Sequence, residues 1–161
     1  MQVRTAQLEE SEQISALINN AFRSERFFAV GDRTNPEKIK ALFDTGKFLL
    51  MLHQGTIVGC IYYEIRGERG YFGLLAVDSD RQRSGIGAKL VTATEQECIT
   101  AGCQFMDLTI VNLRTELPAY YERLGYRENG TLPFPSDQQS KIPVHLVRMS
   151  KRLGYIRTPQ E

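Results

Sequence analysis

The chain has few residues of the kinds used for disulfide or metal chemistry. Among 161 residues there are three cysteines and two histidines. Cys60, Cys98 and Cys103 contain no C-x-x-C pair, and no basic and apolar leader is seen at the N-terminus, so we expect reduced, buried thiols in a cytoplasmic protein. His53 and His145 lie far apart in the sequence, and no metal site is expected.

Charge excess and long apolar runs are also missing. A net charge of +1 gives no electrostatic reason to expect a nucleic-acid partner. No segment approaches the ~20 apolar residues of a membrane span, so no membrane partner is expected. With 42% hydrophobic and 24% charged residues, the composition is typical of a globular protein. We expect a single domain at residues 1–153 and a polar tail at residues 154–161.

The segment 74–90, LLAVDSDRQRSGIGAKL, carries the strongest local pattern. Its apolar start predicts a strand, DSD predicts a turn, and residues 88–101 predict a helix. The first N–H groups of a helix have no intrahelical acceptor and lie at the positive end of its dipole. Gly85 and Gly87 allow ligand atoms to approach the backbone. The segment therefore predicts a diphosphate site, with Arg83 adding positive charge.

Two other nucleotide motifs fit this segment poorly. A P-loop needs Gly-Lys-Ser/Thr at the start of the helix, whereas Gly87 is followed by Ala88, Lys89 and Leu90. A dinucleotide fingerprint needs a third glycine where this chain has Leu90. Taken alone, the loop could also be an ordinary tight turn into a helix.

Apolar periodicity and turn residues predict the remaining elements. In chain order we expect strand 2–6, helices 9–22 and 36–44, strands 48–52, 56–65 and 71–77, helix 88–101, strand 104–111, helix 115–124, a strand from residue 125 and a strand at 144–150. Residues 131–140 are rich in turn residues and predict a loop. This order predicts an α+β fold, a mixed sheet with helices on both faces.

Two segments resemble motifs of the GNAT superfamily of N-acetyltransferases. Gln82-x-x-Gly85-x-Gly87 is similar to the acyl-CoA-binding pattern Gln/Arg-x-x-Gly-x-Gly/Ala. YYERLGY at 120–126 is similar to the family's aromatic-Tyr-Glu-Lys/Arg-Leu-Gly-Phe/Tyr segment. The resemblance implies a GNAT-like fold: a central, twisted, mostly antiparallel sheet of roughly six to seven strands, with about four helices on both faces, splayed at the fourth and fifth strands.

The resemblance implies transfer of an acetyl group from acetyl-CoA to a primary amine of a small molecule or peptide, by direct attack in a ternary complex. The implied cofactor-binding residues are Leu75, Ala76, Val77, Gln82, Arg83, Ser84, Gly85, Ile86, Gly87, Ala88, Asn112 and Arg114. Many members carry an Asn seven residues before the catalytic tyrosine, where this chain has Arg114. Either Asn112 still reaches the CoA, or Arg114 takes over a phosphate or substrate contact.

Tyr121 aligns with the family's catalytic tyrosine and is the implied general acid. A phenol with a pKa of about 10 is protonated at pH 7 and can donate to the leaving thiolate. Tyr120 is expected to point elsewhere, into the core. The base is less well marked, because this chain has Tyr71 where some members have a strand glutamate. Glu64 is a possible base, with a solvated edge carboxylate or a water relay as alternatives. Glu116 is expected to cap a helix.

In such folds the acceptor lies between the first helix pair and the late hairpin, here residues 23–32 and 131–141. A partly apolar, partly cationic pocket there would favour an amine that bears a carboxylate, with ordinary surface loops as the alternative. The residues expected to shape it are Arg26, Phe27, Phe28, Arg33, Tyr71 and Phe134. The expected partners are acetyl-CoA and the amine acceptor, in a monomer or homodimer. A non-catalytic acyl-CoA-binding or regulatory module is the alternative function, and simple nucleotide binding is a third.

Overall fold

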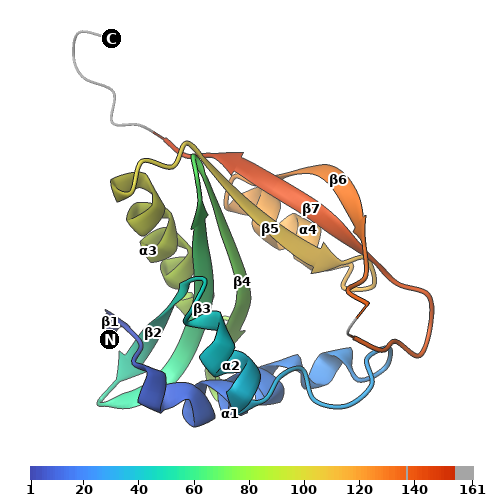
Figure 1. Cartoon of the computed structure of the whole chain (residues 1–161), viewed down its shortest axis with the longest axis horizontal. Coiled ribbons are helices and arrows are strands. Elements are labelled where there is room, and N and C mark those ends of the chain that lie inside the picture. Colours follow the sequence, from blue (N-terminus) through green and yellow to red (C-terminus); the bar gives the residue numbers. More distant parts are fainter. Residues whose placement is uncertain (137, 155–161) are drawn as a thin grey trace, which may run out of the picture.

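One seven-stranded sheet organises the protein, in the order β1-β2-β3-β4-β5-β7-β6 (Figure 1). The computed structural model describes residues 1–136 and 138–154. The strands are β1 (Gln2–Thr5), β2 (Lys47–His53), β3 (Thr56–Arg66), β4 (Arg69–Val77), β5 (Phe105–Val111), β6 (Arg127–Pro133) and β7 (His145–Arg152). The α-helices are α1 (Ser11–Ala21), α2 (Pro36–Leu42), α3 (Ile86–Thr100) and α4 (Leu117–Arg123). Short 3₁₀ turns are η1 (Leu8–Glu10), η2 (Phe22–Glu25) and η3 (Ser79–Arg81). The predicted order of strands and helices is confirmed.

Alternate residues of the central strands supply two separate cores, because successive side chains of a strand point to opposite faces. Phe48 and Leu50 of β2 pack with Ile14 and Ile18 of α1 on one face. Leu49 and Met51 pack on the other face, in a cluster that includes residues of α3 and α4. All four β2 residues are almost fully buried. Helices therefore cover both faces of the sheet, as predicted.

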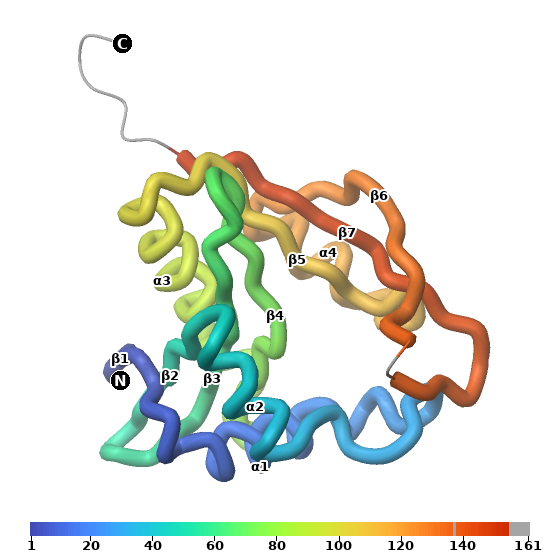
Figure 2. Tube along the Cα trace, viewed as in Figure 1, coloured from blue at the N-terminus to red at the C-terminus, as the bar shows by residue number. Residues whose placement is uncertain are grey.

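The parallel strands β4 and β5 pair only where they begin. Their ladder joins Arg69 to Phe105, Gly70 to Met106 and Tyr71 to Asp107. Beyond it, among the described residues, β4 pairs only with β3 and β5 only with β7, and the strands separate as a V (Figures 1 and 2). The predicted splay between the fourth and fifth strands is confirmed.

A bulge interrupts β4 within the separated part. Its register with β3 passes from Gly73 opposite Tyr62 to Ala76 opposite Cys60. Leu74, inside the bulge, has a φ of 52°, which is uncommon for a residue with a side chain. The bulge therefore turns the backbone of β4 at the point where β5 is no longer its neighbour.

Some element boundaries differ from the sequence predictions. β6 includes residues 131–133, which the sequence assigns to a loop, because they pair with β7. Pro133 is tolerated because it ends the strand. Helix α4 begins at Leu117, late within the predicted range 115–124, as Pro118 in its first turn requires. Of the predicted tail 154–161, residues 155–161 lie outside the described residues. None of the helices in the described part is long and apolar enough to cross a membrane.

We expect Gly70 to be required where β4 and β5 still pair. A Cβ at this position would lie 2.6 Å from Cys98 Sγ and 3.0 Å from Met106 Sδ. Cys98 is fully buried on α3, so Gly70→Ala must push the helix away from the sheet. The free energy of unfolding should fall by about 1–3 kcal/mol in urea denaturation. Gly154→Ala adds a methyl group with nothing within 4 Å and is the control; equal losses in both variants would contradict this packing.

Candidate active site

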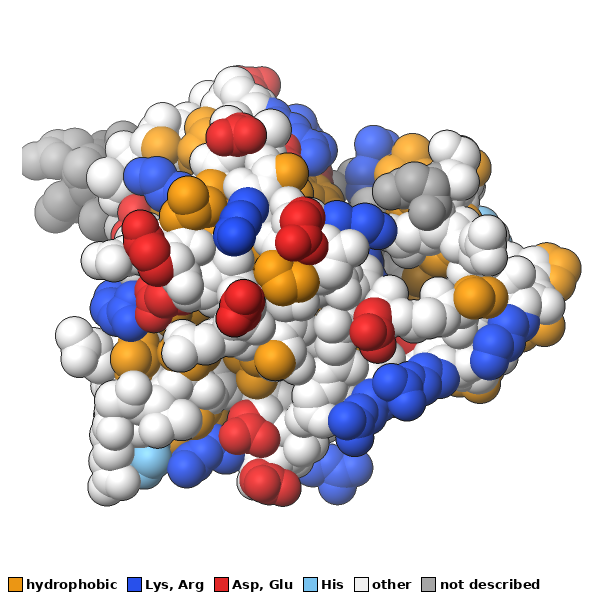
Figure 3. All heavy atoms as spheres, turned by 60° about the horizontal axis from the view of Figure 1, so that its bottom comes forward, with side chains coloured by type: hydrophobic (Ala, Val, Ile, Leu, Met, Phe, Trp, Pro, Cys, Tyr) orange, Lys and Arg blue, Asp and Glu red, His pale blue; other side chains and the backbone are white. Residues whose placement is uncertain are grey.

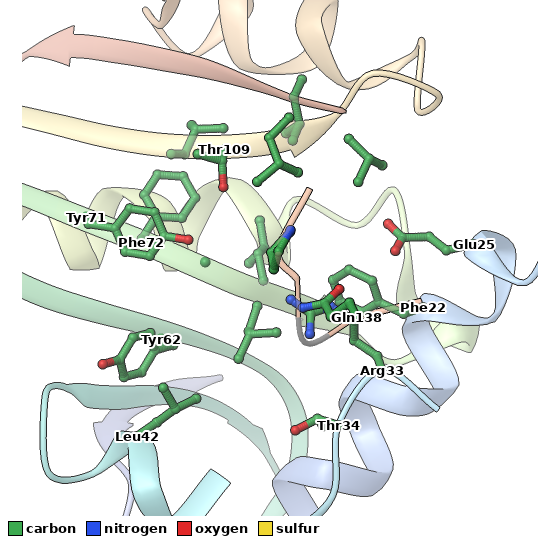
Figure 4. A pocket seen from close by; sticks show the side chains of 18 of the residues that line it. Phe22, Glu25, Arg33, Thr34, Leu42, Tyr62, Tyr71, Phe72, Thr109 and Gln138 are labelled. Carbon is green, nitrogen blue, oxygen red and sulfur yellow. The ribbon is translucent and has the colours of Figure 1, made fainter. Parts of the chain in front are cut away.

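A cavity of about 600 Å³ lies where β4 and β5 diverge. One side is formed by η2, α2 and the segment between them, the other by β5 and the residues that follow β6, and β3 and β4 form the floor. The side chains labelled in Figure 4 come from all of these elements: Phe22, Glu25, Arg33, Thr34, Leu42, Tyr62, Tyr71, Phe72, Thr109 and Gln138. The separation of two strands thus creates a chamber inside the fold.

The cavity wall brings together predicted site residues from distant parts of the chain. They are Arg33, Glu64, Tyr71, Leu75, Arg114, Tyr121 and Phe134. Three residues predicted for the acceptor pocket do not belong to this wall as the structure describes it. Phe28 is completely buried beneath the loop, Phe27 is 55% exposed on the surface, and Arg26 forms an ion pair with Asp32.

The glycine-rich segment has a backbone conformation that is uncommon for residues with side chains. Arg83 and Gly85 adopt φ values of 69° and 85°, both in the left-handed region. The N–H of Lys89 donates to the carbonyl of Gly85, whereas no acceptor in the described part of the chain takes the N–H groups of residues 82–88. Residues 82–85 are exposed to solvent. These N–H groups are therefore available to an anion.

Gly87 allows the start of α3 to approach β4 and α4. A Cβ on Gly87 would lie 2.9 Å from Tyr120 Oη, 3.8 Å from Leu75 Cδ2 and 3.9 Å from Val77 Cγ2. Tyr120 is only partly buried, and its hydroxyl lies beside the glycine-rich segment. The expectation that Tyr120 serves only the core is therefore incomplete, and nothing in the spacing of the residues reveals its second contact.

Tyr121 is almost fully buried, with 7% of its surface exposed. Its ring packs against Tyr120, Phe72 and Tyr126 at centroid distances of 5.1, 6.0 and 6.1 Å. Burial, helped by the neighbouring phenol of Tyr120, raises the pKa of Tyr121 well above its usual value. The hydroxyl therefore carries its proton throughout the neutral and mildly alkaline range, and can act as a donor.

The predicted base, Glu64, is already engaged within the protein. Its carboxylate accepts hydrogen bonds from Tyr62 Oη at 2.7 Å and Arg66 Nε at 2.9 Å. Burial would raise the pKa of Glu64, but these two hydrogen bonds outweigh burial and lower it. An ionised carboxylate held in this way is a weak proton acceptor.

Arg114 joins parts of the chain that lie 89 residues apart. Its Nη1 donates to Glu25 Oε2 at 2.9 Å and its Nε to Glu116 Oε1 at 2.6 Å. Burial raises the pKa of Glu25 even though Arg114 acts against it. The guanidinium of Arg114 thus binds two carboxylates. Glu25 lines the cavity, and the hydrophobic periodicity of the sequence does not predict this position.

Two further expectations about this region need correction or refinement. Glu116 occupies the N-cap position of α4, but its carboxylate makes no capping hydrogen bond and binds Arg114 instead. Asn112 Oδ1 accepts the N–H of His145 at 2.9 Å and holds the end of β5 to β7. Asn112 Oδ1 and two nitrogens of Arg114 are therefore engaged with other parts of the protein.

We expect the Arg114–Glu25 pair to matter for stability. The exposed fractions of the two side chains are 21% and 10%, so Arg114→Met leaves a buried carboxylate without its cation. The free energy of unfolding in urea should fall by about 3 kcal/mol at pH 7. Adding Glu25→Gln removes the stranded charge and should restore most of this loss.

Arg66→Met is the matched control for this pair. It breaks a pair whose arginine is 57% exposed and should cost no more than about 1 kcal/mol. A double variant at positions 25 and 114 as unstable as Arg114→Met alone would mean that packing, not charge, explains the loss.

Comparison with known proteins agrees with this geometry. A sequence model described as the acetyltransferase (GNAT) family matches residues 13–126. The uncharacterized protein YdhI of Bacillus subtilis (strain 168) is 30% identical over 104 residues, which are 65% of this chain. The match spans 64% of YdhI, so the chain covers slightly less than two thirds of this curated relative.

Solved structures share the fold at low sequence identity. The structure of smu.2055 from Streptococcus mutans UA159 matches with a TM-score of 0.78 and 22% identity, over 96% of this chain and 100% of that one. An aminoglycoside 6'-N-acetyltransferase complexed with coenzyme A matches with a TM-score of 0.74 and 18% identity, over 98% and 100% of the two chains. The family match covers most of the chain and includes both sequence motifs, and the chain belongs to the acetyltransferase (GNAT) family.

Proposed function

We propose that this protein transfers an acetyl group from acetyl-CoA to a primary amine. The observation that carries this proposal is that the free N–H groups of residues 82–88 and the buried Tyr121 flank the separated part of β4. Membership of the acetyltransferase (GNAT) family supports the same reaction class. The structural similarity to a coenzyme A complex supports CoA as the carrier.

In this proposal the diphosphate of acetyl-CoA binds to the N–H groups of residues 82–88 at the start of α3. The pantetheine arm follows residues 75–77 of β4 as an added strand, because β4 has no partner on its β5 side there among the described residues. Gln82 Nε2 lies 3.4 Å from the carbonyl oxygen of Val77 and links the loop to the end of this strand. The thioester then reaches the cavity.

The amine attacks the thioester carbonyl carbon, and a tetrahedral intermediate forms. A backbone N–H of β4 near Val77 stabilises its oxyanion. When the C–S bond breaks, Tyr121 gives its proton to the leaving sulfur, and the new amide bond remains. Because Glu64 is ionised and already accepts two hydrogen bonds, we assign removal of the amine proton to water rather than to Glu64.

The direct test follows the free thiol of CoA when the protein is mixed with acetyl-CoA and a panel of amines. We expect thiol release that depends on the amine. Calorimetric binding of acetyl-CoA with no release for any amine would instead favour a non-catalytic acyl-CoA-binding module. Stabilisation by ATP but not by CoA would favour simple nucleotide binding.

Tyr121→Phe removes the proposed acid and leaves the ring in place. We expect kcat to fall about 100-fold, with the Kd for acetyl-CoA nearly unchanged, measured by thiol release and calorimetry. Tyr120→Phe removes the neighbouring hydroxyl and should leave kcat within about 3-fold of the parent value. An unchanged kcat in Tyr121→Phe would remove this residue from the mechanism.

Gly87→Asp places a negative charge among the N–H groups proposed to bind the diphosphate. Repulsion should raise the Kd for acetyl-CoA by about 10-fold or more. Thr92→Asp adds the same charge to an exposed position further along α3, beyond its first turn, and is the control. Equal affinities in the two variants would place the diphosphate elsewhere.

A further inference from the structure

The described cavity wall contains more cationic side chains than carboxylates, so not every cation has an ion-pair partner there. Arg66 is hydrogen-bonded to Glu64, and Arg114 to Glu25. These pairs use both carboxylates that the described wall contains. The remaining cations of the wall are Arg33 and Lys38, and neither forms an ion pair with any described residue. One side of the cavity therefore carries two cations without an ion pair to a described residue, although Arg33 is close enough to Glu25 to act on the pKa of that carboxyl.

Lys38 belongs to the face of α2 that looks into the cavity. Lys38, Ala41 and Leu42 all line the wall, and positions three and four residues apart share one face of a helix. Lys40, on the same helix, is exposed and lies outside the described wall. In the space-filling view the surface is hollowed between two lobes, with Lys and Arg side chains near the rim (Figure 3).

Arg33 lines the cavity from the segment before α2, and Gln138 lines it from the segment after β6 (Figure 4). It is half-buried, and its guanidinium carbon lies 5.8 Å from the centroid of the Phe22 ring. This packing restricts the side chain, so that less conformational entropy is lost when an anion binds. Arg33 and Gln138 together offer N–H donors from opposite sides of the cavity.

The backbone that carries these cations is held in place. Asn19 of α1 forms two hydrogen bonds with the backbone of Thr34, each 3.0 Å long. Asn35 caps α2 by accepting the N–H of Lys38 at 2.9 Å. Arg33 and Lys38 thus flank a segment fixed by side-chain hydrogen bonds, which is the arrangement expected of a preformed binding site.

We infer that the acceptor is a small amine that also carries a carboxylate, and that Arg33 and Lys38 bind this carboxylate. Arg and Lys are the usual partners of carboxylates, and a charge-assisted hydrogen bond is among the stronger ones in proteins. This assignment rests on the acetyl transfer proposed above. Aromatic residues of the same wall, Tyr62, Phe72 and Phe134, fit an acceptor with an apolar body. An apolar α-amino acid combines these features.

The ion pairs of Glu25 and Glu64 also disfavour the binding of acceptors with several positive charges. An ammonium group in addition to the reacting amine would need an anionic partner, yet Glu25 and Glu64 are already bonded to arginines. Desolvating such a group beside Arg33 and Lys38 is unfavourable. The cavity therefore discriminates by charge in both directions.

The experiment compares phenylalanine with phenylalaninamide as acceptors, by release of CoA thiol at pH 8. Amidation removes the carboxylate and lowers the pKa of the α-amino group, so more of the amide is in the reactive neutral form. Without recognition of the carboxylate, the amide would be the better acceptor. We expect the opposite, with kcat/KM about 10-fold or more in favour of phenylalanine.

Variants then assign this preference to the two cations. Arg33→Gln and Lys38→Gln should each reduce kcat/KM for phenylalanine about 10-fold, mainly through KM, with little change for phenylalaninamide. Lys40→Gln removes the same charge from α2 outside the described cavity wall and should leave the preference intact. Arg33→Glu should reverse it in favour of the amide. All of these positions are exposed or half-buried, and thermal melting checks that the variants fold.

The outcomes separate the two proposals. Thiol release that is equal for both acceptors, or greater for the amide, overturns the carboxylate site and leaves acetyl transfer standing. A preference for phenylalanine that survives in both Gln variants overturns the role of Arg33 and Lys38. Absence of release with either acceptor, in a protein that binds acetyl-CoA, counts against both proposals.

Discussion

The separation of β4 from β5 is the constraint on which the rest of the structure depends. Two parallel strands that continued to pair would lie about 4.8 Å apart and leave no space between them. Here pairing stops after Tyr71 and Asp107. On its other edge, β5 keeps a full ladder with β7 from Phe105 to Val111. Each half of the sheet is thus supported from its outer side.

The two halves meet again at the far end of the cavity. There Arg114 hydrogen-bonds Glu25, and Ala29 forms an isolated bridge with Ser140 (Figure 2). The N–H of Lys141 also donates to the carbonyl of Phe28. These contacts join the loop to the late segment beside Phe28, which is buried, whereas its neighbour Phe27 is exposed. They also limit how far the V can open.

The parts of the fold that depend on neighbouring residues could be predicted from the sequence. Strand and helix order follows from periodicity, and the glycine-rich turn follows from residues 82–88, because their conformation is set locally. The contacts of Arg114 and of Glu25 could not be predicted, since they join segments that are 89 residues apart. Glu116 illustrates the same limit: its position favours a helix cap, but a nearby guanidinium competes for its carboxylate.

The pKa values of Tyr121 and Glu64 in the cavity are shifted in opposite directions, the first by burial and the second by hydrogen bonds. Burial keeps the proton on Tyr121, while Tyr62 and Arg66 keep Glu64 ionised. Tyr121 can therefore serve as a proton donor and Glu64 as a fixed negative charge. Neither of the two is suited to remove a proton near pH 7. Neither of these two groups removes the proton of the acceptor amine, and we therefore assign that step to solvent in the proposed reaction. Lys38 is exposed to solvent, and it lies with Arg33 on the wall that we propose holds the carboxylate of the acceptor.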